Sequence, residues 1–175
     1  MTMDRGPGGS RLVLRSGDMA RLVGELDWAA TPIGPIGGWP AGLTSSVNLC
    51  LASPLPALVA WGDELTQVYN DAASQVLGER HPAALGQRAR ASWGELWATL
   101  APALRRALET GEATRSPVLR LPVRRDDAVE EAFYELCVSP VFDDVGAVGG
   151  LFGQFVDTTE QVVSARRWRL LGELG

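Results

Sequence analysis

The sequence predicts an α+β domain in which a five-stranded antiparallel sheet carries helices on one face. Three observations indicate this fold class. Two short strand-like stretches lie near residue 60, and three longer ones follow residue 115. Between these two groups, apolar residues recur at helical spacing. Short turns separate successive strands, so we expect antiparallel neighbours and helices that pack together on the sheet.

The length and charge of the chain restrict its function. With 175 residues, 46% of them hydrophobic, it is long enough for one globular domain with flanking segments. The net charge of −5 disfavours nucleic acid as a partner, because affinity for phosphate comes from clustered cationic side chains. All 16 basic residues are arginine, which excludes mechanisms that need a lysine amine. The sequence shows neither a signal peptide nor a membrane-spanning run, so we expect a cytoplasmic protein.

A tail and two helices are predicted before the sheet. Residues 1–15 are rich in glycine, which is typical of a disordered tail. Residues 16–53 form a predicted helical extension, with helices at 16–27 and 41–53 joined by the apolar loop TPIGPIGGWP. These segments offer more apolar surface than one small sheet needs, which predicts a homodimer.

Residues 54–157 are the predicted core of the domain. LPALVAWG and LTQVY form a predicted hairpin, after which Asn70 and Asp71 are expected as turn and cap residues of a short helix. The longest helical pattern covers residues 93–112, where leucines recur every four residues and Gly111 is the expected stop. Three further strands are predicted at 116–124, 132–141 and 146–156.

The last predicted strand ends at an acidic residue, and a helix follows it. Asp157 can accept hydrogen bonds from the first helical turn while Glu160 reaches back, a variant of the capping box. Residues 158–175 are then predicted to begin a signalling helix with one apolar seam. The seam consists of Val163, Arg167, Leu170 and Leu174.

This order of elements, with the motifs VYNDAASQVLG, LRRALETGE and GLFGQFVDTTEQ, resembles the PAS sensory domains. It is most similar to the N-terminal PAS domains of bacterial sensor histidine kinases and related signalling proteins. In such domains an asparagine ends the second strand, a Gly-Glu pair follows the long helix, and Asp-x-Thr-Glu ends the last strand. The matching residues are Asn70, Gly111 with Glu112, and Asp157 with Thr159 and Glu160.

The resemblance implies a sensory and dimerisation module of a two-component system that is not itself an enzyme. It implies that Asp157, Thr159 and Glu160 relay the signal to output domains that lie outside this chain. The signal would be a small molecule or a change of conformation. An interaction domain without a ligand is the alternative with the same fold.

The resemblance also has implications for cofactors. Members that sense blue light bind flavin and carry an Asn-Cys-Arg-Phe-Leu motif, which this sequence lacks. These members also have a glutamine in the last strand; this sequence has Phe155 at that position, and Gln154 is one place away. We therefore expect no flavin adduct. Haem is disfavoured because the only histidine, His81, lies in a loop before a helix, where a capping or surface role is expected. Cys50 and Cys137 form no CxxC motif, which predicts reduced, buried thiols and no metal site.

The inner face of the predicted sheet and the helix over it supply candidates for a small-molecule pocket. These residues are apolar or aromatic, so they could equally fill the core. The candidates are Trp93, Trp97, Leu100, Leu104, Leu119, Tyr134, Leu136, Leu151 and Phe155.

A small cone-shaped α+β enzyme, such as an isomerase or a hydrolase, is an alternative of a different class. Glu135 is its candidate general base, because it lies in the middle of a predicted strand. The sequence disfavours this reading, since no nucleophile and base form a recognisable pair. Four neighbouring acids are expected in a charged loop at the start of the strand: Asp126, Asp127, Glu130 and Glu131.

Overall fold

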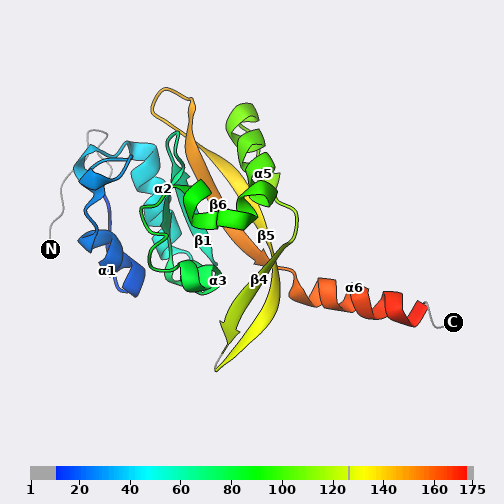
Figure 1. The fold of residues 1–175 in the computed structure, drawn as a ribbon. Helices are drawn as coiled ribbons and strands as arrows, with labels where there is room; N and C mark the ends of the chain where they lie inside the picture. The colour runs from blue at the N-terminus through cyan, green and yellow to red at the C-terminus, as the bar shows by residue number, and fades with distance from the viewer. Residues whose placement is uncertain (1–10, 126, 173–175) are drawn as a thin grey trace.

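The structure, a computed structural model, describes residues 11–125 and 127–172. In these ranges six strands form one antiparallel sheet in the order β2-β1-β6-β5-β3, and β4 pairs with the first half of β5 (Figure 1). The α+β prediction is confirmed. The sixth strand is the two-residue β3, too short to be recognised from sequence. The strands are β1 (Ala57–Trp61), β2 (Thr66–Tyr69), β3 (Thr114–Arg115), β4 (Leu119–Arg125), β5 (Ala128–Phe142) and β6 (Val148–Asp157).

Six α-helices are described, with short 3-10 turns between some of them. None of the helices in the described part of the chain is both long and apolar enough to cross a membrane. The helices are α1 (Asp18–Glu25), α2 (Ala41–Ala52), α3 (Asp71–Leu77), α4 (Ala89–Trp93), α5 (Trp97–Thr110) and α6 (Thr159–Gly172).

Helices cover both faces of the sheet at β1. All five residues of β1 are buried, which requires cover on both sides because strand side chains alternate. Leu58 lies on one face, together with Trp93 of α4 and Leu104 of α5. Trp61 lies on the opposite face, where its ring would be 3.4 Å from a Cβ added at Gly42 of α2. The N-terminal extension therefore packs on its own sheet, opposite α4 and α5.

The apolar surface of the N-terminal extension is buried within the same chain. The Trp28 and Trp39 rings pack edge to face with centroids 5.0 Å apart. Both indole N–H groups donate to backbone carbonyls, at Val23 (2.7 Å) and Gly34 (2.9 Å). The reason given above for a homodimer is therefore wrong, because this surface is used in covering the sheet. The side chains buried in this layer are Met19, Val23, Trp28, Trp39, Leu43, Val47 and Cys50.

The predicted tail includes residues that belong to the fold. Leu12 is only 4% exposed, and the Val13 N–H donates to Asn48 Oδ1 on α2 at 2.8 Å. The tail prediction is wrong for residues 11–15. It was based on the average composition of the segment, which does not show that Leu12 packs into the core. Residues 1–10 lie outside the described ranges.

Two other boundaries differ from the predictions. The helix predicted over 93–112 is divided into α4 and α5 at Gly94, whose φ of +51° is incompatible with an α-helix. Gly111 ends α5 with a left-handed conformation, as predicted. Strand β5 begins at Ala128, so Glu130 and Glu131 lie in a strand and not in a loop. The hairpin of β4 and the first half of β5 projects from the sheet (Figure 1). In β4 the buried residues Leu119, Leu121 and Val123 alternate with exposed neighbours, whereas residues 128–131 of β5 are all exposed.

Candidate functional site

The sheet, α4 and α5 enclose a small apolar cavity on the face that we predicted to carry a ligand. Its volume is about 10 Å³, which is at most enough for one water molecule. The sheet side is formed by residues of β1, β2, β5 and β6. Four of the predicted pocket residues line the cavity: Trp93, Leu104, Leu136 and Leu151.

The remaining predicted pocket residues fill the space around this cavity. The Phe155 ring lies 5.7 Å from the Trp93 ring and 6.5 Å from the Tyr134 ring, measured between centroids. Leu100 and Leu119 are buried, and Trp97 is half-buried at the edge of the core. The structure brings these side chains together as a packed core with little free volume.

Gln67 on β2 is a polar residue of this cavity that our sequence analysis did not identify. It is 1% exposed, and its Oε1 accepts a 2.7 Å hydrogen bond from Trp93 Nε1. That bond fixes the orientation of the amide, because indole N–H can only donate. Gln67 Nε2 has no hydrogen-bond partner among the described residues. A buried donor without a partner is costly, so this cavity can provide a hydrogen bond to a small molecule or a water.

Asn70 connects three elements at the opposite end of β2. It is 2% exposed, and its position as N-cap of α3, which we predicted, is confirmed by a 2.9 Å bond from Ala73 N–H to its Oδ1. The same oxygen accepts from Ala57 N–H of β1 at 3.1 Å. Its Nδ2 lies within donating distance of three carbonyl oxygens at the end of α2: Cys50 (3.1 Å), Ser53 (3.1 Å) and Leu55 (2.7 Å).

His81, which follows this region, contacts Tyr69 of β2. Its Nδ1 lies 3.1 Å from the Tyr69 hydroxyl, which also donates to the Pro82 carbonyl at 3.4 Å. The two rings meet edge to face with centroids 5.9 Å apart. Burial raises the pKa of Tyr69 to about 12, so the phenol is neutral at physiological pH.

Tyr69 should make the stability of the protein decrease at high pH. The folded chain favours the neutral phenol, so the free energy of unfolding contains a contribution that is complete below pH ~10 and disappears as the pH rises through about 12. We expect this dependence to be smaller in Tyr69→Phe, because that variant cannot ionise. Urea unfolding of both proteins from pH 8 to 11.5 measures the difference, and parallel curves would contradict the assignment. Cys50 also titrates in this range, but it contributes equally to both proteins.

Neither cysteine faces the cavity. Cys50 is buried, its Sγ donates to the Ala57 carbonyl at 3.3 Å, and burial raises the pKa of its thiol to about 12. Cys137 is half-buried, contrary to prediction, and lies between Leu136 and Val138 of β5, both of which line the cavity. Its side chain therefore points to the other face. In the described ranges no three His, Cys, Asp or Glu side chains are grouped to hold a metal ion.

Two acidic residues of β5, Glu131 and Glu135, form ion pairs with arginines. Glu135 Oε2 lies 3.1 Å from Arg115 Nη1, on the face opposite the cavity, which disfavours a role as a general base. Glu131 pairs with Arg120 and lies 3.6 Å from Arg166 of α6. Glu130 is exposed in the hairpin, as is Asp127, and Asp126 lies outside the described residues.

The beginning of α6 is attached to β5 at Phe133. The Thr158 N–H donates to the Phe133 carbonyl at 2.7 Å, and the Phe133 N–H donates to Thr159 Oγ1 at 2.9 Å. The Arg166 guanidinium lies 4.8 Å from the centre of the Phe133 ring. Sequence pattern alone does not indicate the contacts of Phe133 with Thr158 and Arg166, because they join residues 25 and 33 positions apart.

The predicted cap at Asp157 is confirmed in part. Asp157 Oδ1 accepts a 2.9 Å hydrogen bond from the Thr159 N–H at the first residue of α6. Glu160 is exposed, and the connection to the sheet is made by Thr158 and Thr159. Leu174 of the predicted seam lies outside the described residues.

Comparison with solved structures finds several chains with a similar fold. An RNA-binding Light-Oxygen-Voltage receptor matches with a TM-score of 0.53 and 24% identity, over 83% of this chain and 41% of that one. A variant of RsLOV gives 0.51 and 21%, over 76% and 80% of the two chains. A phage VqmA–DPO complex gives 0.52 and 16%, over 77% and 60%. At these identities the similarity shows the fold alone.

Comparison of the sequence with protein families identifies the fold more directly. No curated protein matches this chain. A family model described as PAS fold matches residues 52–163, which is more than half of the sequence and includes all six strands and the beginning of α6. The chain therefore belongs to the PAS family.

Proposed function

We propose that this chain is the sensory module of a bacterial signal-transduction protein, of the kind that precedes the kinase domains of sensor histidine kinases. It passes a change in the packing of the sheet to α6 and from there to output modules outside this chain. The observation that carries the proposal is the pair of hydrogen bonds that joins Thr158 and Thr159, at the start of α6, to the backbone of Phe133 in β5. We propose no catalytic activity for the domain itself.

Two neighbouring residues of β5 connect the core to the signalling helix α6. Phe133 holds the start of α6, and the next residue, Tyr134, packs against Phe155 in the core. Tyr134 is also paired in register with Asp157, the last residue of β6. A displacement of the core aromatics would therefore move the end of the β5–β6 ladder where α6 begins. This arrangement supports relay roles for Asp157 and Thr159, whereas Glu160 is exposed on α6.

Two forms of sensing fit the core. The cavity of about 10 Å³ favours a ligand-free relay, whereas the unpartnered Gln67 Nε2 favours a small ligand that accepts a hydrogen bond. Similarity to Light-Oxygen-Voltage receptors raises flavin as a ligand, but both thiols lie away from the cavity, which disfavours an adduct. Native mass spectrometry separates the two forms, since a bound small molecule adds its mass to the chain.

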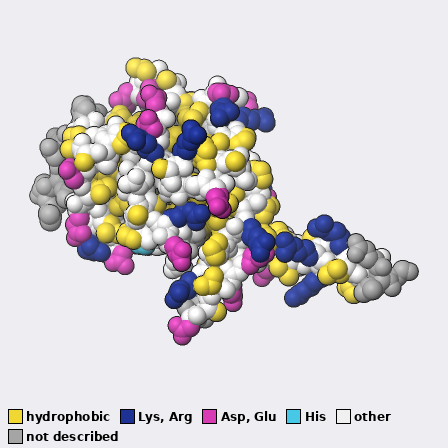
Figure 2. Space-filling model, in the orientation of Figure 1, with side chains coloured by type: hydrophobic (Ala, Val, Ile, Leu, Met, Phe, Trp, Pro, Cys, Tyr) yellow, Lys and Arg dark blue, Asp and Glu magenta, His cyan; other side chains and the backbone are white. Residues whose placement is uncertain are grey.

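We further propose that the module forms a homodimer through α6. Trp168, Leu170 and Leu171 of this helix are all more than 60% exposed, with Trp168 at 74%. Figure 2 shows apolar and arginine side chains side by side along the projecting helix. Exposed apolar side chains on a projecting helix are stabilised when the helix pairs with a second copy. With a net charge of −5, we propose a cytoplasmic protein that signals to protein modules and not to nucleic acid.

Thr159→Val tests the relay contact. The substitution keeps the shape of the side chain but removes the oxygen that accepts the Phe133 N–H. We expect the amides of the first two turns of α6 to exchange with solvent about fivefold faster, which corresponds to the loss of about 1 kcal/mol. Hydrogen–deuterium exchange measured by mass spectrometry detects this change.

The matched control is Thr110→Val, at the end of α5. Thr110 Oγ1 donates to the Arg106 carbonyl within its own helix, so this variant makes the same chemical change at a site remote from α6. If the two variants leave the exchange of α6 equally unchanged, the contact with Phe133 does not hold the helix and the relay proposal loses its basis.

A further inference from the structure

Trp93 separates the core cavity from a groove at the surface. The groove has a volume of about 1440 Å³ and lies between α3 and the hairpin of β4 and β5, which are neighbours in Figure 1. Arg80 lines this groove, and its guanidinium lies 5.6 Å from the centre of the Trp93 ring. The indole lines the cavity of about 10 Å³ and is only 2% exposed. A molecule can therefore pass from the groove into the core only if the indole moves.

We propose that Trp93 is a gate, and that the ligand it admits is a neutral planar heterocycle in which an N–H lies beside a carbonyl oxygen, as in a cyclic amide. This ligand takes the place of the indole against Gln67. The inference names the ligand class for the ligand-binding form of the proposed function, and it rests on that form.

The side-chain amide of Gln67 determines the class of ligand. Its Oε1 accepts from Trp93 Nε1 at 2.7 Å, and its Nε2 has no hydrogen-bond partner among the described residues. Indole has one N–H and no acceptor, so it can satisfy only half of the amide. A cyclic amide presents a donor and an acceptor side by side, so it can bond to Oε1 and Nε2 together. The second hydrogen bond favours this ligand over the indole.

The other walls of the cavity are suited to a flat, uncharged ring. Apart from Gln67, the residues that line it are apolar or glycine, and they come from β1, β5, β6, α4 and α5. A charged ligand would lose its hydration there without gaining an ion pair, which is costly. The Phe155 ring, 5.7 Å from the Trp93 ring, would contact a ring that replaces the indole. These walls favour a neutral aromatic ligand.

The backbone next to Trp93 allows the gate to open. Ala89 N–H, at the start of α4, donates to the Leu65 carbonyl at 3.0 Å, so this end of the helix is held to the strand region. Gly94, with φ of +51°, directly follows Trp93 and separates α4 from α5. Rotation at this glycine can move the end of α4 while its start stays in place. The displaced indole would enter the groove, where it can remain in contact with Arg80.

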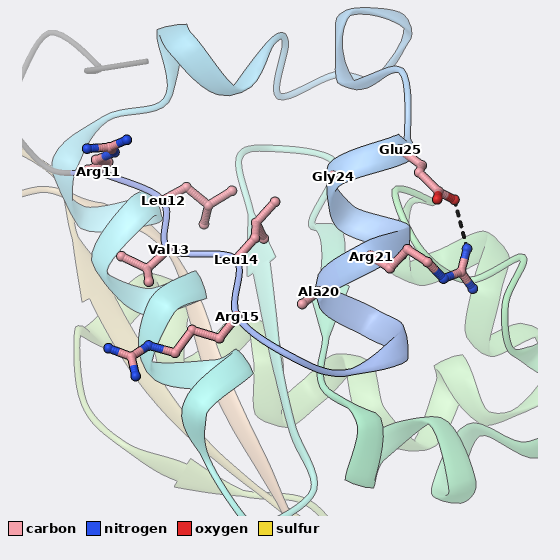
Figure 3. A pocket seen from close by; sticks show the side chains of 9 residues that line it. All are labelled: Arg11, Leu12, Val13, Leu14, Arg15, Ala20, Arg21, Gly24 and Glu25. Atoms are coloured by element: carbon pink, nitrogen blue, oxygen red, sulfur yellow. Dashed lines mark hydrogen bonds and ion pairs between the residues drawn. The ribbon is translucent and has the colours of Figure 1, made fainter. Parts of the chain in front are cut away.

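The hollow between residues 11–15 and α1 does not provide a comparable site. Leu14 fills the space over Gly24, where an added Cβ would lie 3.0 Å from Leu14 Cδ1 (Figure 3). The side chains of Arg11 and Arg15 point away from α1 and are exposed. The buried amide of Gln67 is therefore the feature that points to a ligand.

Isothermal titration of the 175-residue chain with 2-quinolinone tests the ligand class. This neutral bicyclic amide is similar in size to indole and carries its N–H beside the carbonyl oxygen. N-methyl-2-quinolinone is the matched probe, because it has the same rings but no N–H. We expect 2-quinolinone to bind with a Kd lower by about tenfold or more. Absence of 2-quinolinone binding, or equal affinity for the two probes, would overturn the proposal.

Trp93→Phe tests the gate. Phenylalanine cannot donate to Gln67 Oε1, so the closed state is weakened and a larger fraction of the chain can accept a ligand. We expect 2-quinolinone to bind about tenfold more tightly to this variant, whereas loss of a simple contact residue would weaken binding. The matched control is Trp97→Phe at the edge of the core, which should change the Kd by less than about twofold. Unchanged or weaker binding to Trp93→Phe, or the same gain in the control, would refute the gate.

Gln67→Leu tests the hydrogen bonds and separates this inference from the proposed relay. The variant lacks both polar atoms of the amide, so the two quinolinones should bind with affinities within about twofold of each other. A preference for 2-quinolinone that survives in Gln67→Leu would contradict the role of the amide. The relay is measured independently by hydrogen exchange in Thr159→Val. A chain that binds neither quinolinone but loses protection of α6 in Thr159→Val would overturn this inference and leave the relay in place.

Discussion

Asn70→Ala is expected to lower the free energy of unfolding by about 4 kcal/mol. The side chain is 2% exposed and its amide connects five backbone groups of α2, β1 and α3. Each buried backbone group that loses its partner costs about 1–3 kcal/mol, although neighbouring losses do not add fully. Urea unfolding followed by circular dichroism measures the change.

Two further variants identify the cause. Asn48→Ala removes two hydrogen bonds from a half-buried asparagine on α2, so we expect a loss of only about 1 kcal/mol. Asn70→Asp keeps the accepting oxygen but places a carboxylate among three carbonyl oxygens. The folded state would favour the protonated acid, so the stability of this variant should recover as the pH falls. If Asn70→Ala costs no more than Asn48→Ala, Asn70 is only a helix cap.

The role of Asn70 illustrates which features the sequence can predict. Its place as N-cap follows from local pattern, because a polar residue before a short apolar helix has few other structural uses. Its contacts with Cys50, Ser53 and Leu55 come from residues 15 to 20 positions earlier. Such contacts depend on where α2 packs, and the local sequence pattern of neither segment predicts that position.

The same distinction applies to the candidate sites. The alternation of the strands placed Tyr134, Leu136 and Phe155 on one face correctly, because the period of two is a local property. The free volume among these side chains is a property of the whole core, so the choice between a ligand pocket and a filled core required the structure. The burial of Leu12 was missed because residues 11–15 were assigned to a tail.

Trp93→Ala is expected to lower the free energy of unfolding by about 3–5 kcal/mol, the usual range for removing a buried tryptophan. The indole packs beside Phe155 and occupies the space between α4 and the sheet. Its loss also deprives Gln67 Oε1 of its donor, so both ends of this buried amide would be without partners. Urea unfolding of the variant and the parent measures the cost.

Free indole should restore part of this stability, because it is the group that the substitution removes. At a concentration ten times its Kd, indole would add about 1.4 kcal/mol to the free energy of unfolding. Indene has nearly the same shape but no N–H, so it cannot donate to Gln67 Oε1, and we expect about tenfold weaker binding. Equal stabilisation by the two compounds would show that the hydrogen bond to Gln67 contributes nothing. A difference in favour of indole would show that Gln67 can select a ligand by its polar group, because the amide would then distinguish two molecules of the same shape.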